Sequence, residues 1–172
     1  MAALVTGGKD SALALYRAIK LGYNVKYLVT MLPQRPESWM FHYPNIHLAD
    51  LFAEAAGFPH VKAETAGVKE AEVEDLKRLL TTLDIDAVVS GAISSQYQKK
   101  RIDEVCHKLG LKSIAPLWHE DPKKLLSQVV DLKMETIIMG VYAYGFDQTW
   151  LGRKIDQITV NDLTELNRKY QI

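Results

Sequence analysis

The 172-residue sequence has little cysteine, no excess of charge of either sign and no long hydrophobic run. Its single cysteine, Cys106, can form no intrachain disulfide, and a metal site of clustered thiolates is excluded. The 21 basic and 21 acidic residues balance, which argues against a nucleic-acid partner held mainly through its phosphates. No apolar run approaches membrane-spanning length, and nothing resembles a signal peptide. We therefore expect a cytoplasmic protein with no membrane partner.

Short apolar segments alternate with amphipathic ones along the chain. The expected strands are mostly apolar without alternation, as in strands covered on both faces; they are Ala3–Thr6, Val25–Met31, His60–Ala63, Ala87–Ser90, Ser113–Ala115 and Thr136–Val141. The expected helices carry apolar residues at helical spacing; they are Ser11–Leu21, Asn45–Ala56, Glu70–Leu83, Ser94–Leu109 and Asp121–Leu132. This alternation predicts a parallel sheet with helices on both faces, a three-layer α/β/α fold in a single domain over residues 1–172.

The most informative segment is Thr6-Gly7-Gly8-Lys9-Asp10-Ser11, between the first expected strand and the first expected helix. Its glycines permit a tight turn and let main-chain N–H groups approach an anion. The helix that follows directs the positive end of its dipole at the same place. Lys9 adds a positive charge, and Asp10 could hold a metal or fix the loop. The segment thus favours a phosphate site, although an ordinary tight turn with Ser11 as helix cap also fits it.

The loops after the other strands hold further candidates, because ligands of such sheets bind at the carboxyl ends of the strands. Gly91 permits close approach of a ligand, and Ser94 is expected to cap the helix that follows. Tyr97, Gln98 and Arg101 lie in its first turns, where they either reach the cleft or form a solvated surface. Cys106 lies on the apolar stripe of this helix, which predicts a core residue and not a nucleophile.

Three further segments carry large aromatic side chains, and the first of them is too aromatic for an ordinary solvated loop. The first is residues 33–44, in which His42 is the histidine best suited to a functional role. The second contains Trp118, which either packs or contacts a ligand. The third runs from Tyr142 to Arg153 and includes Trp150. By contrast, Asp121 followed by Pro122 is typical of a helix start and has a structural explanation.

Together these segments resemble a known family. Thr6–Ser11 is similar to the Ser-Gly-Gly-Lys-Asp-Ser loop of the N-type ATP pyrophosphatases, with Thr6 in place of the usual serine. Further segments resemble the diphthine–ammonia ligase family; they are Glu37-Ser38-Trp39-Met40-Phe41-His42, Gly91-Ala92-Ile93, Tyr97-Gln98 with Arg101, Val105-Cys106 with Leu109-Gly110-Leu111, Pro116-Leu117-Trp118 and Trp150-Leu151-Gly152-Arg153. The resemblance extends from the first residues to about Arg168.

The resemblance implies a Rossmann-like fold of the adenine nucleotide alpha hydrolase-like class. It also implies an ATP-dependent ligase that amidates diphthine on elongation factor 2 with ammonium, through an acyl-adenylate, releasing AMP and pyrophosphate. ATP and Mg²⁺ are the implied cofactors.

The implied site residues fall into three groups. Lys9, Asp10 and Arg101 are catalytic, and Asp10 also holds the metal. The nucleotide contacts Thr6, Gly7, Gly8, Lys9, Asp10, Ser11, Thr30, Met31, Gly91 and Ser94. The acceptor substrate contacts Ser38, His42, Tyr97, Gln98, Trp118, Trp150 and Arg153.

One departure from the family pattern concerns the end of the chain. Family members usually continue past a segment like Leu163–Tyr170 into a stretch rich in glycine and glutamate, whereas this sequence ends at Ile172. We therefore expect it to lack part of the family's C-terminal region. Two alternative functions stay open: another adenylating enzyme of the same fold that modifies tRNA, and a non-catalytic ATP-binding module. A homo-oligomer also stays open.

Overall fold

The computed structural model describes residues 1–41 and 43–171, and the chain divides into two compact units, Met1–His119 and Glu120–Ile172. The sequence suggested one domain, but the alternation of strand and helix that builds the sheet ends within the first unit. The chain after His119 forms a unit of its own. No helix among the residues described is long and apolar enough to cross a membrane.

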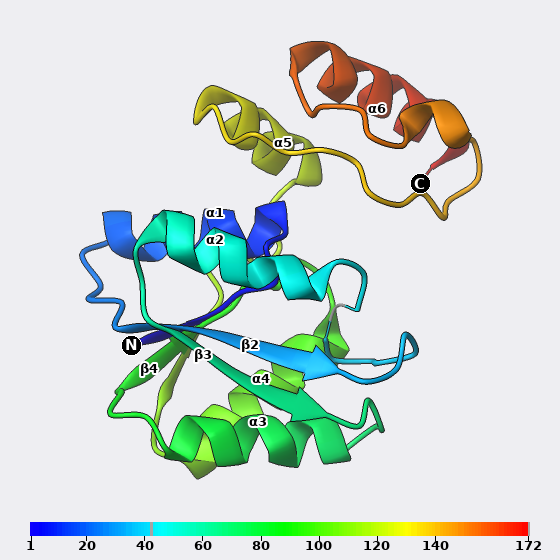
Figure 1. Ribbon diagram of the computed structural model, residues 1–172. Helices are drawn as coiled ribbons and strands as arrows, with labels where there is room; N and C mark the ends of the chain where they lie inside the picture. The colour runs from blue at the N-terminus through cyan, green and yellow to red at the C-terminus, as the bar shows by residue number, and fades with distance from the viewer. Residues whose placement is uncertain (42, 172) are drawn as a thin grey trace. The chain divides into compact units, whose positions relative to one another are not determined.

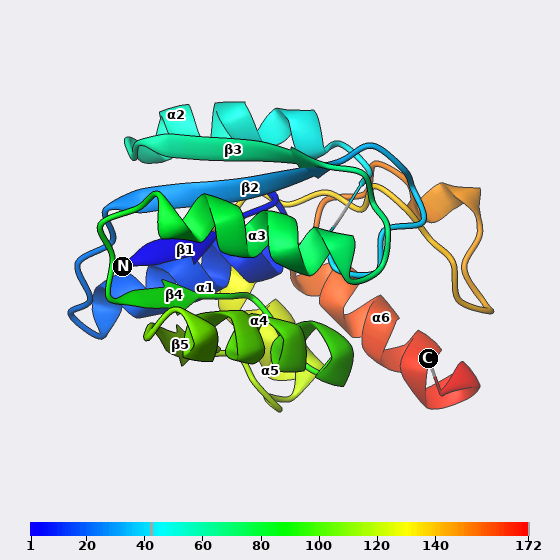
Figure 2. The ribbon, with the colours of Figure 1, turned by 90° about the horizontal axis from the view of Figure 1, so that it is seen from below.

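The first unit is built on a five-stranded parallel sheet with the order β3-β2-β1-β4-β5, which Figure 2 shows from top to bottom. Its strands are β1 (Ala2–Leu4), β2 (Tyr27–Pro33), β3 (His60–Thr65), β4 (Ala87–Val89) and β5 (Lys112–Ile114). In the register of the central strand, Ala2 pairs with Tyr27 on one side and with Val88 on the other. The chain therefore reverses its direction of travel across the sheet between β1 and β4.

Four helices cover the two faces of this sheet (Figure 1): α1 (Lys9–Lys20) and α2 (Ala49–Ala56) lie on one face, and α3 (Ala71–Thr81) and α4 (Gln96–Lys108) on the other. A short 3₁₀ helix, η1 (Ile46–Leu48), precedes α2. Apolar side chains of α3 and α4 pack with the sheet in a core that contains Leu76, Leu80, Val88 and Val105. The expected three-layer α/β/α fold with a parallel sheet is confirmed.

Neither Ser94, the expected cap of its helix, nor Ser11, the alternative interpretation of the first turn, is a helix cap. Helix α1 begins at Lys9, after an extended Gly8, so Ser11 lies inside the first turn and is buried. Helix α4 is capped by Ser95, whose hydroxyl accepts the N–H of Gln98 at 3.4 Å, and not by Ser94. Ser95 has the extended backbone that a cap requires and stands three residues before that N–H group.

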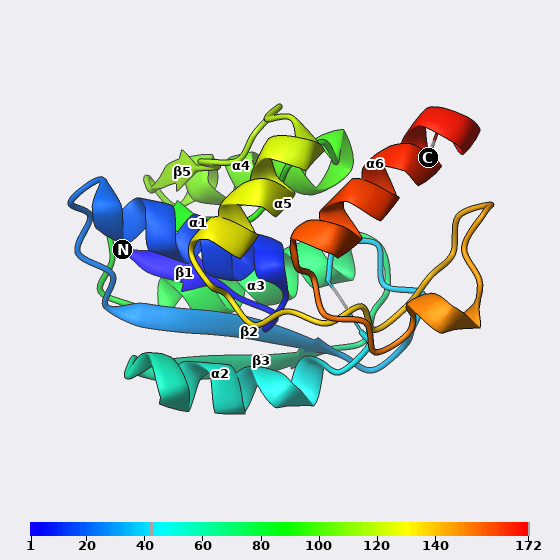
Figure 3. The same cartoon turned by 90° about the horizontal axis from the view of Figure 1, so that it is seen from above.

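The second unit contains helices α5 (Pro122–Asp131) and α6 (Gln157–Tyr170), which pack against each other, and a short 3₁₀ helix, η2 (Gln148–Trp150) (Figure 3). Asp121 accepts the N–H of Lys123 at 2.9 Å and caps α5, as expected. The expected strand Thr136–Val141 is wrong. Only an isolated antiparallel bridge joins Ile137 to Lys154 there, and the Ile137 residue is 52% exposed. An apolar run with no neighbouring strands cannot form a covered strand.

Candidate functional site

The turn from Thr6 to Gly8 leads from the carboxyl end of β1 into α1, at the place where the strand order reverses. Gly7 has a φ of +74°, which suits glycine. Ser11 Oγ accepts the N–H of Thr6 at 3.2 Å and donates to the carbonyl of Gly8 at 2.9 Å. Thr6 Oγ1 accepts the N–H of Gly8 at 3.3 Å. The two hydroxyls therefore close the turn and hold it against the start of the helix.

Gly91, in the turn after β4, lies against the same helix start. A Cβ atom on Gly91 would stand 2.8 Å from the main-chain carbon of Asp10 and 2.8 Å from the nitrogen of Ser11. Since real Cβ atoms are not found so close to main-chain atoms, only glycine fits here. The turns after the two central strands thus meet at the first turn of α1, as the sequence predicted when it grouped Gly91 with this loop.

The charges beside this turn are Lys9 and Asp10. Lys9 Nζ donates to both carboxylate oxygens of Asp10, at 2.8 and 2.9 Å, and both side chains are about one-third exposed. The first N–H groups of an α-helix have no partner within the helix, and the positive end of its dipole lies there. This donor set fits the phosphates of ATP, because the exposed turn at Gly7 and Gly8 leads into the N–H groups of a helix start and has a lysine beside it.

A magnesium ion bound at this turn would take most of its ligands from the phosphates of the nucleotide. Among the described residues, no cluster of three or more His, Cys, Asp and Glu side chains is found. Mg²⁺ in nucleotide enzymes is usually held by one or two carboxylates together with phosphate oxygens. Asp10 fits that pattern as a single carboxylate beside a phosphate site.

The expected adenine contacts Thr30 and Met31 offer main-chain atoms and not side chains. The hydroxyl of Thr30 is buried, donates to the carbonyl of Val5 at 2.8 Å and lies 2.8 Å from His60 Nε2. The side chain of Met31 is buried in the core. The pairing of β1 with β2 ends at Val29, whereas β2 continues to Pro33. The main chain of β2 from Thr30 onward therefore extends past the end of β1.

The loop after β2 is held by a buried carboxylate. Glu72, in the first turn of α3, is 0% exposed; its carboxylate accepts a hydrogen bond from the hydroxyl of Ser38 and, at 3.3 Å, the N–H of Trp39. Ser38 Oγ in turn accepts the N–H of Phe41 at 2.9 Å. Glu72 belongs to no motif of the sequence, although its spacing of four from Leu76 places it on the buried face of the helix.

The first two turns of α4 meet this loop. Gln98 Nε2 donates to the carbonyl of Met40 at 3.1 Å, and the ring of Tyr97 lies edge to face with that of Trp39 at a centroid distance of 5.8 Å. The structure therefore brings together Ser38, Tyr97 and Gln98, and their expected role as acceptor contacts stays a prediction.

Arg101 lies beside this group, with its guanidinium 5.3 Å from the ring centroid of Tyr97. It forms ion pairs with Glu70 and, at 2.9 Å, with Glu104. The hydrogen bond with Glu104 is the main cause that raises the pKa of Arg101 above its ordinary value. Its expected catalytic role stays a prediction.

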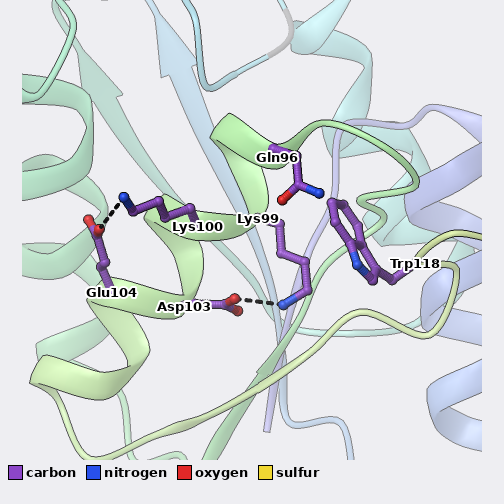
Figure 4. A pocket seen from close by; sticks show the side chains of 6 residues that line it. All are labelled: Gln96, Lys99, Lys100, Asp103, Glu104 and Trp118. Atoms are coloured by element: carbon purple, nitrogen blue, oxygen red, sulfur yellow. Dashed lines mark hydrogen bonds and ion pairs between the residues drawn. The ribbon is translucent and has the colours of Figure 1, made fainter.

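Trp118 and one side of α4 line a surface hollow of about 420 Å³ on the first unit (Figure 4). Lys99 Nζ lies 5.5 Å from the ring centroid of Trp118 and 2.6 Å from a carboxylate oxygen of Asp103. Lys100 and Glu104, one turn apart on α4, form a second, looser pair at 4.0 Å beside the same hollow. Because each lysine faces a carboxylate, the hollow carries little net charge.

Trp150 and Arg153 have structural roles within the second unit. Trp150 is buried and packs edge to face on Phe146, at 5.1 Å between centroids. The Arg153 guanidinium lies 4.6 Å from the Trp150 ring and pairs with Asp162. Their expected contact with substrate is still a prediction. His42 lies outside the described residues.

Cys106 is buried in the core of the first unit, which confirms the expectation from its apolar stripe. Burial raises the pKa of its thiol to about 11. The thiolate form that a nucleophile needs is therefore scarce near neutral pH.

Comparison with known protein families decides the assignment. The diphthamide synthase N-terminal domain matches residues 1–113, and the diphthamide synthase C-terminal domain matches residues 121–172. The chain belongs to the diphthamide synthase family. The boundary between the two matched domains falls beside the boundary between the two units of the structure, after His119.

The chain is similar to several proteins that are named diphthine–ammonia ligase. The Schizosaccharomyces pombe protein is 32% identical over 98% of this chain, which spans 31% of that protein. The Bos taurus and Homo sapiens proteins are each 30% identical over the whole chain, which spans 73% of each. A solved structure from Methanocaldococcus jannaschii, described as a predicted subunit of tRNA methyltransferase, superposes with a TM-score of 0.58. It is 19% identical, with 83% of this chain and 80% of that chain covered, and shows a shared fold alone.

Proposed function

We propose that this protein amidates diphthine on elongation factor 2 to diphthamide, using ATP and ammonium. Family membership and the names of the relatives support the reaction class. The observation that carries the proposal is the close approach of Gly91 to Asp10 and Ser11, at the point where the strand order reverses. Nucleotides bind at such points in open α/β sheets.

The phosphates of ATP are then bound by the N–H groups at the start of α1 and by Lys9. In the free protein Lys9 is paired with Asp10, so binding replaces that pair with contacts to phosphate. Mg²⁺, held by Asp10 together with phosphate oxygens, would supply further neutralisation of charge. The adenine contacts main-chain atoms of Thr30 and Met31, with Ser94 near the adenylate.

The chemistry proceeds in two balanced steps. A carboxylate oxygen of diphthine attacks the α-phosphorus of ATP, the bond from that phosphorus to the bridging oxygen breaks, and pyrophosphate leaves. Ammonium loses a proton to solvent, and the resulting ammonia attacks the acyl carbon. The bond from that carbon to the phosphate oxygen breaks, AMP leaves, and a second proton is lost to give the amide. Negative charge grows on the departing pyrophosphate, where the N–H groups of the helix start stabilise it together with the Lys9 ammonium once that group has left Asp10.

The acceptor side is formed by Ser38, Tyr97 and Gln98, which the loop after β2 and the start of α4 bring together. We assign Arg101 to the same side, as a cation near the acceptor carboxylate. Trp118 is a further proposed acceptor contact on the first unit, and the expected contacts of Trp150 and Arg153 on the second unit stay predictions.

The proposal is tested by incubating the protein with ATP, Mg²⁺, ammonium and elongation factor 2 that carries diphthine. The expected products are AMP, pyrophosphate and an amide at the modified histidine, read by chromatography and peptide mass. An oxygen label placed in the diphthine carboxylate is expected in AMP. Formation of ADP would overturn the adenylate step, and an unchanged acceptor would overturn the function. Turnover that requires tRNA would favour the other adenylating enzyme instead.

A matched pair of variants locates the reaction. Asp10→Asn is expected to lower AMP formation by on the order of 10²-fold, because it removes the carboxylate beside the phosphates. Asp84→Asn is the control, because it removes the same single negative charge from another lysine–aspartate pair. In that pair Lys26 Nζ lies 2.8 Å from a carboxylate oxygen of Asp84. This variant is expected to retain activity, since Asp84 precedes β4 and lies at the amino ends of the strands. Equal activity of the two variants would contradict the assigned site.

A further inference from the structure

A lysine ammonium lies over two aromatic rings at the acceptor side. Lys69 Nζ is 4.9 Å from the ring centroid of Trp39 and 5.4 Å from that of Tyr97. The two rings stand at 63° to each other. Within the residues described, Lys69 has no carboxylate partner. A cation within about 6 Å of a ring face is attracted by the electrons of the ring, so this corner already binds a cation from its own chain.

The corner formed by the rings of Trp39 and Tyr97 is held in place by hydrogen bonds to the main chain of Trp39 and Met40. Trp39 is 61% exposed, yet its N–H is bound by the fully buried Glu72. The next residue, Met40, is tied through its carbonyl to Gln98 on α4. A tryptophan that is held in place and still left exposed is typical of a binding surface, since burying its ring would be favourable.

We propose that Trp39 and Tyr97 bind the quaternary ammonium group of the acceptor, and that Lys69 occupies its place in the free protein. The inference rests on the proposed function, because diphthine carries a trimethylammonium group close to the carboxylate that is amidated. A quaternary ammonium donates no N–H hydrogen bonds, so aromatic faces are its natural partners. Lys69 is readily displaced, since a primary ammonium is strongly hydrated and sits on a flexible stem.

The binding test uses two small probes of the same shape on the wild-type chain. Glycine betaine carries a trimethylammonium group, and 3,3-dimethylbutanoate replaces its charged nitrogen by carbon. Betaine is expected to shift the NMR signal of the Trp39 indole N–H and to leave those of Trp118 and Trp150 in place. The Trp39→Phe variant assigns the signal. Equal shifts with both probes, or no shift of the Trp39 signal, would overturn the inference.

The kinetic test uses diphthine-bearing elongation factor 2. Trp39→Leu is expected to raise the KM for this acceptor about 10-fold with little change in the KM for ATP, and Trp39→Phe to restore much of the loss, because the ring face is what binds. Tyr16→Leu is the control: it removes a ring contacted by Lys20 at 5.6 Å on α1, outside the proposed site.

The outcomes separate the inference from the function on which it rests. Normal acceptor KM in Trp39→Leu would overturn the ammonium site while amidation stands. Absence of amidation by the wild type would overturn the function, and the probe titration would still decide whether the corner binds a quaternary ammonium. If Trp39→Leu loses ATP binding because it misfolds, the titration of the wild-type chain is the deciding measurement.

Discussion

Replacing Gly91 by alanine adds one methyl group where the turn after β4 meets α1. The new Cβ would stand 2.8 Å from the carbon of Asp10 and from the nitrogen of Ser11, and 2.9 Å from the carbonyl oxygen of Asp10. All three are main-chain atoms of a helix start, which cannot rotate away. Overpacking of this kind typically costs about 1–3 kcal/mol. We expect Gly91→Ala to lower the free energy of unfolding by that amount in urea titrations, and to weaken ATP binding in calorimetry.

Gly140→Ala is the matched control. Its Cβ would meet atoms at a similar distance, 2.9 Å, but these belong to the side chain of Tyr142. That residue is 91% exposed, and its side chain can turn into solvent. We therefore expect a change within about 0.5 kcal/mol. If Gly91→Ala is as stable as Gly140→Ala and binds ATP like the wild type, the close approach of the two turns is refuted.

Two further predictions concern buried groups. Glu72→Ala leaves the Ser38 hydroxyl and the Trp39 N–H without their acceptor. The free energy of unfolding, measured by urea titration, is therefore expected to fall by about 1–3 kcal/mol, and by less in Glu72→Gln. Equal stability of Glu72→Ala and the wild type would contradict these contacts. For Cys106, the pKa rise from 9.0 to about 11 leaves about a hundredfold less thiolate near neutral pH, and the thiol is buried. It is expected to resist a thiol reagent at neutral pH until denaturant is added, and rapid labelling of the folded protein would show that this interpretation is wrong.

Local patterns were enough to predict the sheet and the glycine turn between β1 and α1, whose binding of phosphate stays a prediction. Strands that are mostly apolar, and the glycines at Gly7 and Gly91, carry information that does not depend on distant residues. The helix starts were less well predicted, because Ser94 and Ser95 are equally good cap residues by type. Only the backbone of Ser95 decides between them.

The missed features depend on contacts between distant parts of the chain. The apolar run at Thr136–Val141 resembles a strand, but it has no neighbour beyond the bridge at Ile137. Glu72 was overlooked because carboxylates are seldom fully buried, and its partner Ser38 lies 34 residues away. Lys69 was not singled out, since its two rings come from different segments.

Helix α6 was missed for a different reason. Its buried residues are the small pair Thr159 and Val160, so its apolar stripe is weak. The clearest signal in the sequence is Asp156, whose carboxylate accepts the N–H of Thr159 at 2.8 Å and caps the helix. A cap without a strong stripe after it does not predict a helix by itself.

The central claim is that a triphosphate binds where the turn after β1 enters α1. A crystal structure of the protein with a non-hydrolysable ATP analogue and Mg²⁺ tests it most directly. We predict phosphate oxygens within hydrogen-bond distance of the main-chain N–H groups between Gly8 and Ser11, with Lys9 turned from Asp10 toward them. Nucleotide found elsewhere, with the pair of Lys9 and Asp10 intact, would contradict the account.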